Sequence, residues 1–311
     1  MALEPSYIKI FKTGDLKKRI IKAFELLENC SMCPRECEAE RTKNKKGTCE
    51  IGHLPRIASY HAHFGEEDPL VGNYGSGTIF LSSCNLLCIY CQNYTISHLN
   101  EGSEVSFENF AKMMLYLQEK GCHNINFVTP THQVPQILKS LEIAIEKGLS
   151  VPLVYNSSGY DKAETLKLLD GIFDIYMPDL KYMDSEAAQK YSKAKDYPEV
   201  VKKAIKEMHN QVGDLVLDER GIAIRGLLIR HLVLPNRLSG TKKAMEFIAN
   251  EISKNTYVNI MDQYHPCYKA FDFPELSRRI SHEEYKEAVN IAKEAGLTRL
   301  DRRERVRIVF L

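Results

Sequence analysis

Residues 77–91 read GTIFLSSCNLLCIYC, an apolar run followed at once by three cysteines. The run at residues 77–81 is typical of a buried strand, and Cys84, Cys88 and Cys91 follow it in a loop. Because a 4Fe–4S cluster normally takes four thiolates, three thiolates leave one iron open to an exogenous ligand, as a catalytic zinc is open at its fourth position. The fixed spacing argues against the alternative, in which the cysteines pack as small apolar side chains.

The rest of the chain predicts the fold in which this loop sits. From about residue 75, short apolar runs alternate with longer amphipathic ones, which is typical of strand–helix units around a parallel sheet. Six strands are expected, at residues 78–81, 125–128, 151–155, 172–177, 227–234 and 257–261. Helices are expected at residues 107–120, 134–147, 198–211, 242–254 and 282–295, with Ser106, Thr241 and Ser281 as caps. We therefore expect an α/β fold, a partial (β/α)6 TIM-like barrel with its reactive groups at the carboxyl ends of the strands.

Residues 1–70 have a different character. A helix is expected at residues 16–28, and a Cys-x2-Cys-x3-Cys-x11-Cys array follows it, formed by Cys30, Cys33, Cys37 and Cys49. Four thiolates at short spacing, with Pro34 and Gly47 as turn residues, can wrap a metal and fold a segment that has little core. Zinc and an auxiliary 4Fe–4S cluster both suit this shell, and loose thiols on a disordered arm are the alternative. The expected division is a metal-binding segment at residues 1–70 and the barrel at 71–311.

Composition narrows the class of protein. Lys plus Arg number 42 and Asp plus Glu 41 among 311 residues, so charge argues against nucleic acid or an anionic membrane as the main partner. No apolar run approaches the ~20 residues of a membrane span, and residues 1–11 lack the apolar core of a secretory signal. The 9 cysteines, most of them at short spacings, suit metal ligation in a reducing compartment. These features predict a cytoplasmic protein.

The cysteine triplet resembles that of the radical S-adenosylmethionine (SAM) superfamily. In that superfamily the open iron is chelated by the amino and carboxylate groups of SAM. The resemblance implies that a reduced cluster passes one electron to the sulfonium, and that a 5′-deoxyadenosyl radical then abstracts hydrogen from a substrate. The cofactor supplies the difficult chemistry, while the protein orients it and excludes water. Cys84, Cys88 and Cys91 would thus be the catalytic cluster ligands.

Within the superfamily, the chain is similar to the pyruvate formate-lyase activating enzymes, and specifically to their PflX-type branch. The similarity runs nearly end to end. The matching segments are CSMCPREC (30–37), HFGEEDP (63–69), GSGTIF (75–80), CNLLCIYCQN (84–93), NINFVTPTH (124–132), VYNSSGY (154–160), DIYMPDLKY (174–182), IRHLVLP (229–235) and NIMDQYHP (259–266).

The resemblance also implies SAM contacts at successive strand ends. Thr129 and Thr131 stand where activating enzymes carry a Gly-Gly-Glu stretch that binds the SAM amino group, and the glutamate charge is absent here. Their alternative role is to cap the next helix. Asn156 and Ser157 align with residues that contact the SAM carboxylate and ribose.

Two later strand ends complete the implied SAM site. Asp179 and Lys181, in a Met-x-Asp-x-Lys pattern, are implied near a cation and the SAM carboxylate, or else form a simple ion pair at the rim. On the next strand only one of Arg230 and His231 can face inward, since neighbouring side chains point to opposite faces. His231 is the expected one, and a core histidine satisfied by backbone groups is the alternative.

Two polar segments flank these strands. His63, Glu66 and Glu67 could cover the cluster or form an exposed acidic turn. Residues 262–265, DQYH, could shape the substrate space or pack at the rim.

The leading hypothesis is a radical SAM enzyme, an activating-enzyme-like oxidoreductase. Its expected partners are SAM, an electron donor such as flavodoxin or ferredoxin, and a substrate that is a protein, a peptide or a small molecule. The competing class is a noncatalytic iron–sulfur electron carrier or scaffold. A nucleic-acid-modifying enzyme is a third reading. It would use a set of basic residues, namely Arg41, Lys43, Lys45, Lys46, Arg302, Arg303, Arg305 and Arg307.

Overall fold

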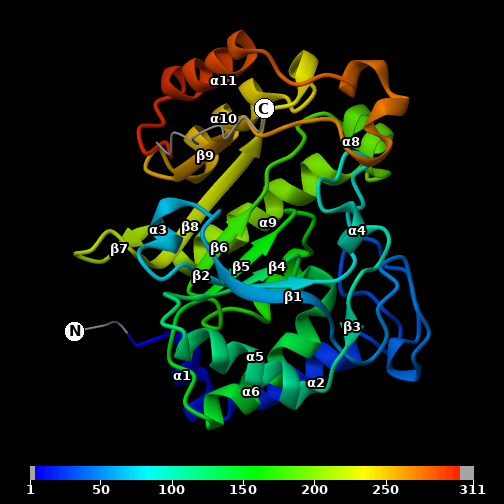
Figure 1. Ribbon diagram of the computed structural model, residues 1–311, viewed down its shortest axis with the longest axis vertical. Helices are drawn as coiled ribbons and strands as arrows, with labels where there is room; N and C mark the ends of the chain where they lie inside the picture. Colours follow the sequence, from blue (N-terminus) through cyan, green and yellow to red (C-terminus); the bar gives the residue numbers. More distant parts are fainter. Residues whose placement is uncertain (1–3, 302–311) are drawn as a thin grey trace, which may run out of the picture.

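Six parallel strands form the centre of the sheet in the computed structural model, which describes residues 4–301 (Figure 1). In sheet order they are β2 (Ser76–Leu81), β4 (Ile125–Val128), β5 (Leu153–Ser157), β6 (Ile175–Pro178), β8 (Ala223–Leu232) and β9 (Tyr257–Met261). Each neighbouring pair is parallel. The α/β fold with a mainly parallel sheet is confirmed, and all six expected strands are present, although several boundaries differ.

Antiparallel strands extend the sheet at its edges. β1 (Arg56–His63) pairs with β2, β3 (Ser103–Glu104) pairs with β1, and β7 (Val216–Leu217) pairs with β8. β1 lies inside the segment expected to be separate from the barrel, so the sheet begins before residue 70. The arginines at 302, 303, 305 and 307 lie outside the described residues.

The helices cover the sheet and follow the expected capping in two of three cases. Their bounds are α1 (Ser6–Lys12), α2 (Asp15–Glu25), α3 (Asp68–Val71), α4 (Tyr94–Ser97), α5 (Phe107–Glu119), α6 (Val134–Glu146), α7 (Ala163–Lys167), α8 (Ser185–Ser192), α9 (Tyr197–Val212), α10 (Thr241–Phe247) and α11 (His282–Glu294). Ser106 accepts a hydrogen bond from Asn109 N, and Ser281 forms a capping box with Glu284. Thr241 does not cap α10; its hydroxyl contacts the ring of His231 instead. None of the helices in residues 4–301 is long and apolar enough to cross a bilayer.

The N-terminal segment packs along one side of this core. Helix α2 lies against α6 (Figure 1), since its buried residues Leu16, Ile20 and Ala23 form one apolar stripe. The loop that follows carries the four early cysteines and a short 3-10 turn, η1 (Arg41–Lys43). This segment therefore shares the hydrophobic core of the barrel.

Candidate functional site

A cavity of about 440 Å³ opens at the carboxyl ends of the parallel strands. Its volume lies within the range of ordinary small-molecule sites. The wall includes residues that follow or end the strands: Cys84, Cys88, Cys91, Thr129, Asn156, Ser157, Asp179, Lys181, Arg230 and Gln263. The tertiary structure thus brings most of the expected site residues to one place.

The three cysteines after β2 share one wall of this cavity. Cys88 is buried, and Cys84 and Cys91 are half-buried. The backbone N–H of Leu86 donates to Cys84 Sγ at 3.3 Å, and the Ser97 hydroxyl donates to Cys91 Sγ at 3.2 Å. Burial raises the pKa of Cys84 to about 12, so its thiolate needs a cationic partner such as iron to form at neutral pH.

The spacing of these sulfurs suits a cluster better than one ion. Among residues 4–301, no group of three or more His, Cys, Asp or Glu side chains is gathered closely enough to hold a single metal ion. A cluster spreads its thiolates, because its irons and sulfides lie between them. The cysteine loop offers three thiols to this wall, which fits a 4Fe–4S cluster with one iron left for another ligand.

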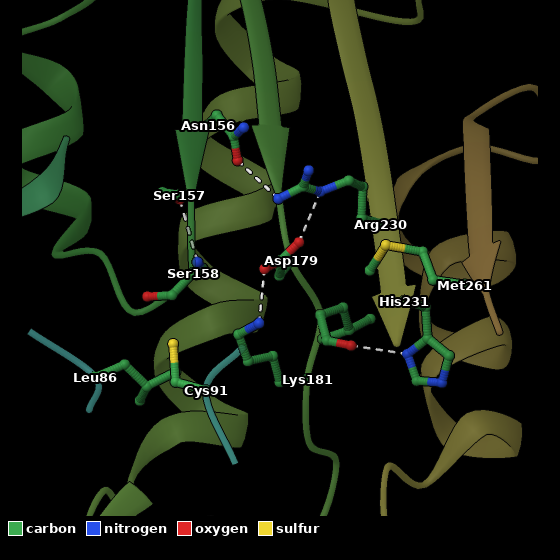
Figure 2. A network of polar contacts seen from close by, with 12 residues as sticks. Leu86, Cys91, Asn156, Ser157, Ser158, Asp179, Lys181, Arg230, His231 and Met261 are labelled. Atoms are coloured by element: carbon green, nitrogen blue, oxygen red, sulfur yellow. Dashed lines mark hydrogen bonds and ion pairs between the residues drawn. The ribbon is translucent and has the colours of Figure 1, made fainter. Parts of the chain in front are cut away.

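A charged network lies beside the cysteines (Figure 2). Arg230 donates through Nε to Asp179 Oδ1 at 2.8 Å and through Nη2 to Asn156 Oδ1 at 2.7 Å. Lys181 Nζ donates to the other oxygen of Asp179, Oδ2, at 2.7 Å. Burial acts to raise the pKa of Asp179, but the two cations together hold it below its ordinary value. Asp179 is therefore a carboxylate that holds two cationic side chains in place.

Two acidic residues reach the cavity from the turn before α3. Glu66 and Glu67 are 7% and 3% exposed and line the cavity. Glu66 Oε2 lies 3.4 Å from Arg230 Nη1, and burial raises the pKa of Glu66 to about 7 although Arg230 opposes this. Asn259 donates to Glu67 Oε1 at 2.7 Å, whereas Glu67 Oε2 has no hydrogen-bond partner within residues 4–301. The acidic turn is thus buried in the site, and the alternative of an exposed turn is wrong.

The segment after β4 places only one of its threonines in the cavity. Thr129 lines the wall with a left-handed φ of 61°. Thr131 is buried elsewhere and donates to Asp161 Oδ1 at 2.7 Å, so the expectation that it contacts SAM is wrong. Neither threonine caps α6, whose N-cap residue is Gln133. The physical reason is that the chain turns sharply at Thr129, which directs Thr131 toward the neighbouring loop.

The next strand end keeps both expected residues in the cavity. Asn156 and Ser157 line it. The Ser157 hydroxyl donates to Asp161 Oδ2 at 2.6 Å and accepts from Gly159 N at 3.1 Å, so its position is fixed.

On β8 it is Arg230, and not His231, that faces the cavity (Figure 2). His231 is fully buried on the opposite face, with Nδ1 2.7 Å from Leu180 O and Nε2 3.0 Å from Thr241 Oγ1. Burial lowers the pKa of His231 to about 4, so the ring is neutral. The expectation that His231 contacts SAM is therefore wrong, because alternation along the strand gives that face to Arg230.

The four early cysteines lie at a second, smaller cavity. Cys30, Cys33, Cys37 and Cys49 all line it, together with Arg41, His132 and Asn85. Asn85 directly follows Cys84 in the chain. This second site is therefore next to the loop that carries the cysteine triplet.

Sequence reasoning did not decide the place of three residues in these sites. Glu66 and Glu67 were recognised only as an ambiguous acidic pair, and their apolar surroundings in the turn before β2 are the signal that could have favoured burial. Arg41 was assigned to a solvated basic loop, yet it is 0% exposed. Nothing in its local sequence distinguishes it from the lysines that follow.

Comparison with known proteins agrees with this geometry. Residues 78–219 match the model of the radical SAM superfamily. The chain is 33% identical over 297 residues to the uncharacterized protein MJ0674 of Methanocaldococcus jannaschii, covering 91% of this chain and 79% of that protein. A second protein of that organism, MJ0808, is 23% identical over 292 residues, covering 86% and 81%.

A solved structure supports the fold. It is that of a radical SAM methyltransferase from Sphaerobacter thermophilus, with a TM-score of 0.50 at 13% identity. The match covers 71% of this chain and 64% of that one, less than two thirds of its length. The family match includes β2, the cysteine triplet and the strand ends at Thr129, Asn156 and Asp179. This chain belongs to the radical SAM superfamily.

Proposed function

We propose that the protein is a radical SAM enzyme that binds a 4Fe–4S cluster at Cys84, Cys88 and Cys91 and SAM in the adjoining cavity. The observation that carries the proposal is the position of three cysteines in the same wall as a buried set of charged groups. When bound, the reduced cluster and SAM supply reductive cleavage to a 5′-deoxyadenosyl radical that abstracts hydrogen from a substrate.

The chain's own residues would prepare the cluster. The loop supplies three thiols to the cluster, and the fourth iron would be left for SAM. The N–H of Leu86 and the hydroxyl of Ser97 donate to cluster sulfurs, and such bonds raise the reduction potential of a cluster by stabilising negative charge. These two hydrogen bonds would thus make it easier to reduce the cluster by one electron.

The charged groups suit the two ends of the methionine moiety of SAM. Lys181 and Arg230 offer cationic donors to its carboxylate. Glu66 and Glu67 offer carboxylates to its ammonium group, and the partnerless Oε2 of Glu67 supports this assignment. We propose that these two glutamates replace the acidic residue that the Thr129–Thr131 segment lacks. Asn156 and Ser157 complete the wall on the side of the carboxylate and ribose.

The proposal extends to activating-enzyme-like chemistry. A flavodoxin or ferredoxin would supply the electron, and the substrate would be a partner enzyme that receives a glycyl radical, a peptide or a small metabolite. The similarity to activating enzymes over CNLLCIYCQN, VYNSSGY and DIYMPDLKY supports this assignment. Fold alone does not identify the substrate.

The test uses anaerobically reconstituted protein with dithionite and SAM. We expect 5′-deoxyadenosine to accumulate, and the paramagnetic resonance signal of the reduced cluster to change when SAM is added. The Cys84→Ala, Cys88→Ala, Cys91→Ala triple variant should give neither response. A fully loaded cluster that yields no 5′-deoxyadenosine, with a spectrum indifferent to SAM, would support a noncatalytic iron–sulfur protein instead.

A further inference from the structure

The four cysteines of the N-terminal segment line a small cavity. Cys30, Cys33 and Cys49 are buried and Cys37 is half-buried. The cavity between them has a volume of about 10 Å³, against about 440 Å³ at the larger site. No carboxylate lines it. Sulfur is thus its main source of metal ligands.

The backbone is shaped tightly around these sulfurs. Between residues 36 and 50, four residues other than glycine have a left-handed φ: Glu36, Glu38, Asn44 and Glu50. Such conformations are uncommon outside glycine and cost energy. At Gly47, an added Cβ would lie 2.2 Å from Cys37 Sγ, so only glycine allows the chain to pass here. The segment therefore pays a conformational cost to hold its cysteines together.

Arg41 gives an independent indication of what the cavity holds. Its guanidinium is fully buried and donates to Ile51 O at 2.9 Å, to His132 O at 2.8 Å and to Cys30 Sγ at 3.7 Å. No carboxylate lies within ion-pair distance of it among residues 4–301. A buried charge without a counter-charge is expensive. Thiolates around a metal centre would supply that counter-charge.

Two buried polar atoms in the same wall point the same way. Asn85 Oδ1 and His132 Nδ1 have no hydrogen-bond partner within the described part of the chain, and both residues are 1% exposed. His132 Nε2 is already 2.9 Å from Ser82 O. These unsatisfied atoms and the buried Arg41 indicate that the cavity is a site for a polar or charged group, and that it is not a gap in apolar packing.

We propose that Cys30, Cys33, Cys37 and Cys49 bind a second 4Fe–4S cluster whose negative charge is balanced by Arg41. Zinc would draw four sulfurs to about 2.3 Å from one point, but the cysteines here surround a space and are not gathered closely enough for one ion. The sulfurs of Cys84, Cys88 and Cys91 are likewise not gathered closely enough for one ion. A four-iron cluster matches both the number of thiol ligands and the buried cation beside them.

The second cluster would stand directly behind the first. Arg35, between two of the early cysteines, donates through Nε to Asn85 O at 2.9 Å and through Nη2 to Leu86 O at 3.1 Å. Asn85 lines the smaller cavity, while Cys84 and Leu86 line the larger one. The loop of the cysteine triplet is thus the shared wall of the two sites.

Metal analysis after anaerobic reconstitution tests the proposal without reference to SAM cleavage. We expect about eight irons per chain in the wild type and about four in the Cys84→Ala, Cys88→Ala, Cys91→Ala variant. A Cys33→Ala, Cys37→Ala variant should also keep about four and still bind SAM. Zinc at one per chain in the first variant, or loss of all metal from it while it stays folded, would overturn the assignment.

The charge partner has its own test. In the variant without the Cys84 triplet, Arg41→Met should lower the reduction potential of the remaining cluster, because a positive charge near it is lost, whereas Arg41→Lys should restore part of the shift. A redox titration followed by paramagnetic resonance measures this. An unchanged potential in a folded Arg41→Met protein with full iron content would remove Arg41 from the proposal.

Discussion

Arg230 and Asp179 form a hydrogen-bonded ion pair, with 2.8 Å between Nε and Oδ1, that joins the ends of β8 and β6. The two residues are also bridged through their backbones as parallel neighbours. The second carboxylate oxygen of Asp179 holds Lys181 at 2.7 Å. One buried carboxylate therefore determines where two cationic side chains stand in the candidate SAM site.

Replacing Asp179 by Asn should destabilise the protein and weaken SAM binding. Arg230 and Lys181 would lose their shared counter-charge, and breaking a buried pair from one side costs about 3–5 kcal/mol. Urea unfolding and equilibrium SAM binding measure the two effects. The exposed pair of Lys12 and Glu4 supplies the control, since Glu4→Gln should leave the urea midpoint unchanged. Equal midpoints for the two variants would contradict this prediction.

His231 should make stability depend on pH. Its pKa is lowered from 6.5 to about 4 by burial, so the unfolded chain binds a proton more readily than the fold does. The stability it contributes is present above pH 6.5 and is lost as the pH falls toward 4. Between pH 7 and pH 5 this group should cost about 2 kcal/mol.

Urea unfolding at several pH values checks this effect. His231→Gln should show a shallower fall in unfolding free energy than the wild type, whereas exposed His282→Gln should keep the wild-type slope. A His231→Gln slope equal to that of the wild type would show that the ring is not held neutral in the fold.

Glu67→Gln should weaken SAM binding about tenfold, which corresponds to about 1.4 kcal/mol. The amide keeps the shape and can still accept from Asn259, but it removes the negative charge proposed to face the SAM ammonium group. Binding is measured on protein with a fully reconstituted cluster. Glu119→Gln is the matched control, because Glu119 is exposed on α5 and lies outside the cavity. A Glu67→Gln protein with wild-type affinity would place the ammonium elsewhere.

Gly47→Ala should remove the second cluster selectively. The added Cβ would collide with Cys37 Sγ, so iron content should fall by about four per chain. The first cluster is assessed separately, through the change in its paramagnetic resonance signal when SAM is added. Lys46 is the exposed neighbour of Gly47, and the control variant Lys46→Ala should retain all iron. Full iron content in Gly47→Ala would show that Cys37 is not a ligand in the proposed geometry.

Local pattern was enough to predict the strands and the cysteine loop. Apolar runs of strand length and helix ends such as Ser106 and Ser281 depend on neighbours in the chain, and the structure confirms them. The choice between Arg230 and His231 failed, because both are polar and only pairing with β6 and β9 decides which face each takes. Thr131 failed for a related reason, since the left-handed turn at Thr129 redirects the chain after it.

The sequence by itself determined where the six parallel strands lie along the chain and the positions of the three cysteines after β2, because both depend on residues close together in the chain. The tertiary structure alone decided that Glu66 and Glu67 face the same cavity as Arg230, and that Arg41 is buried among four cysteines. Those contacts join residues far apart in the chain, so they exist only once the sheet has curved and the N-terminal segment has packed against it.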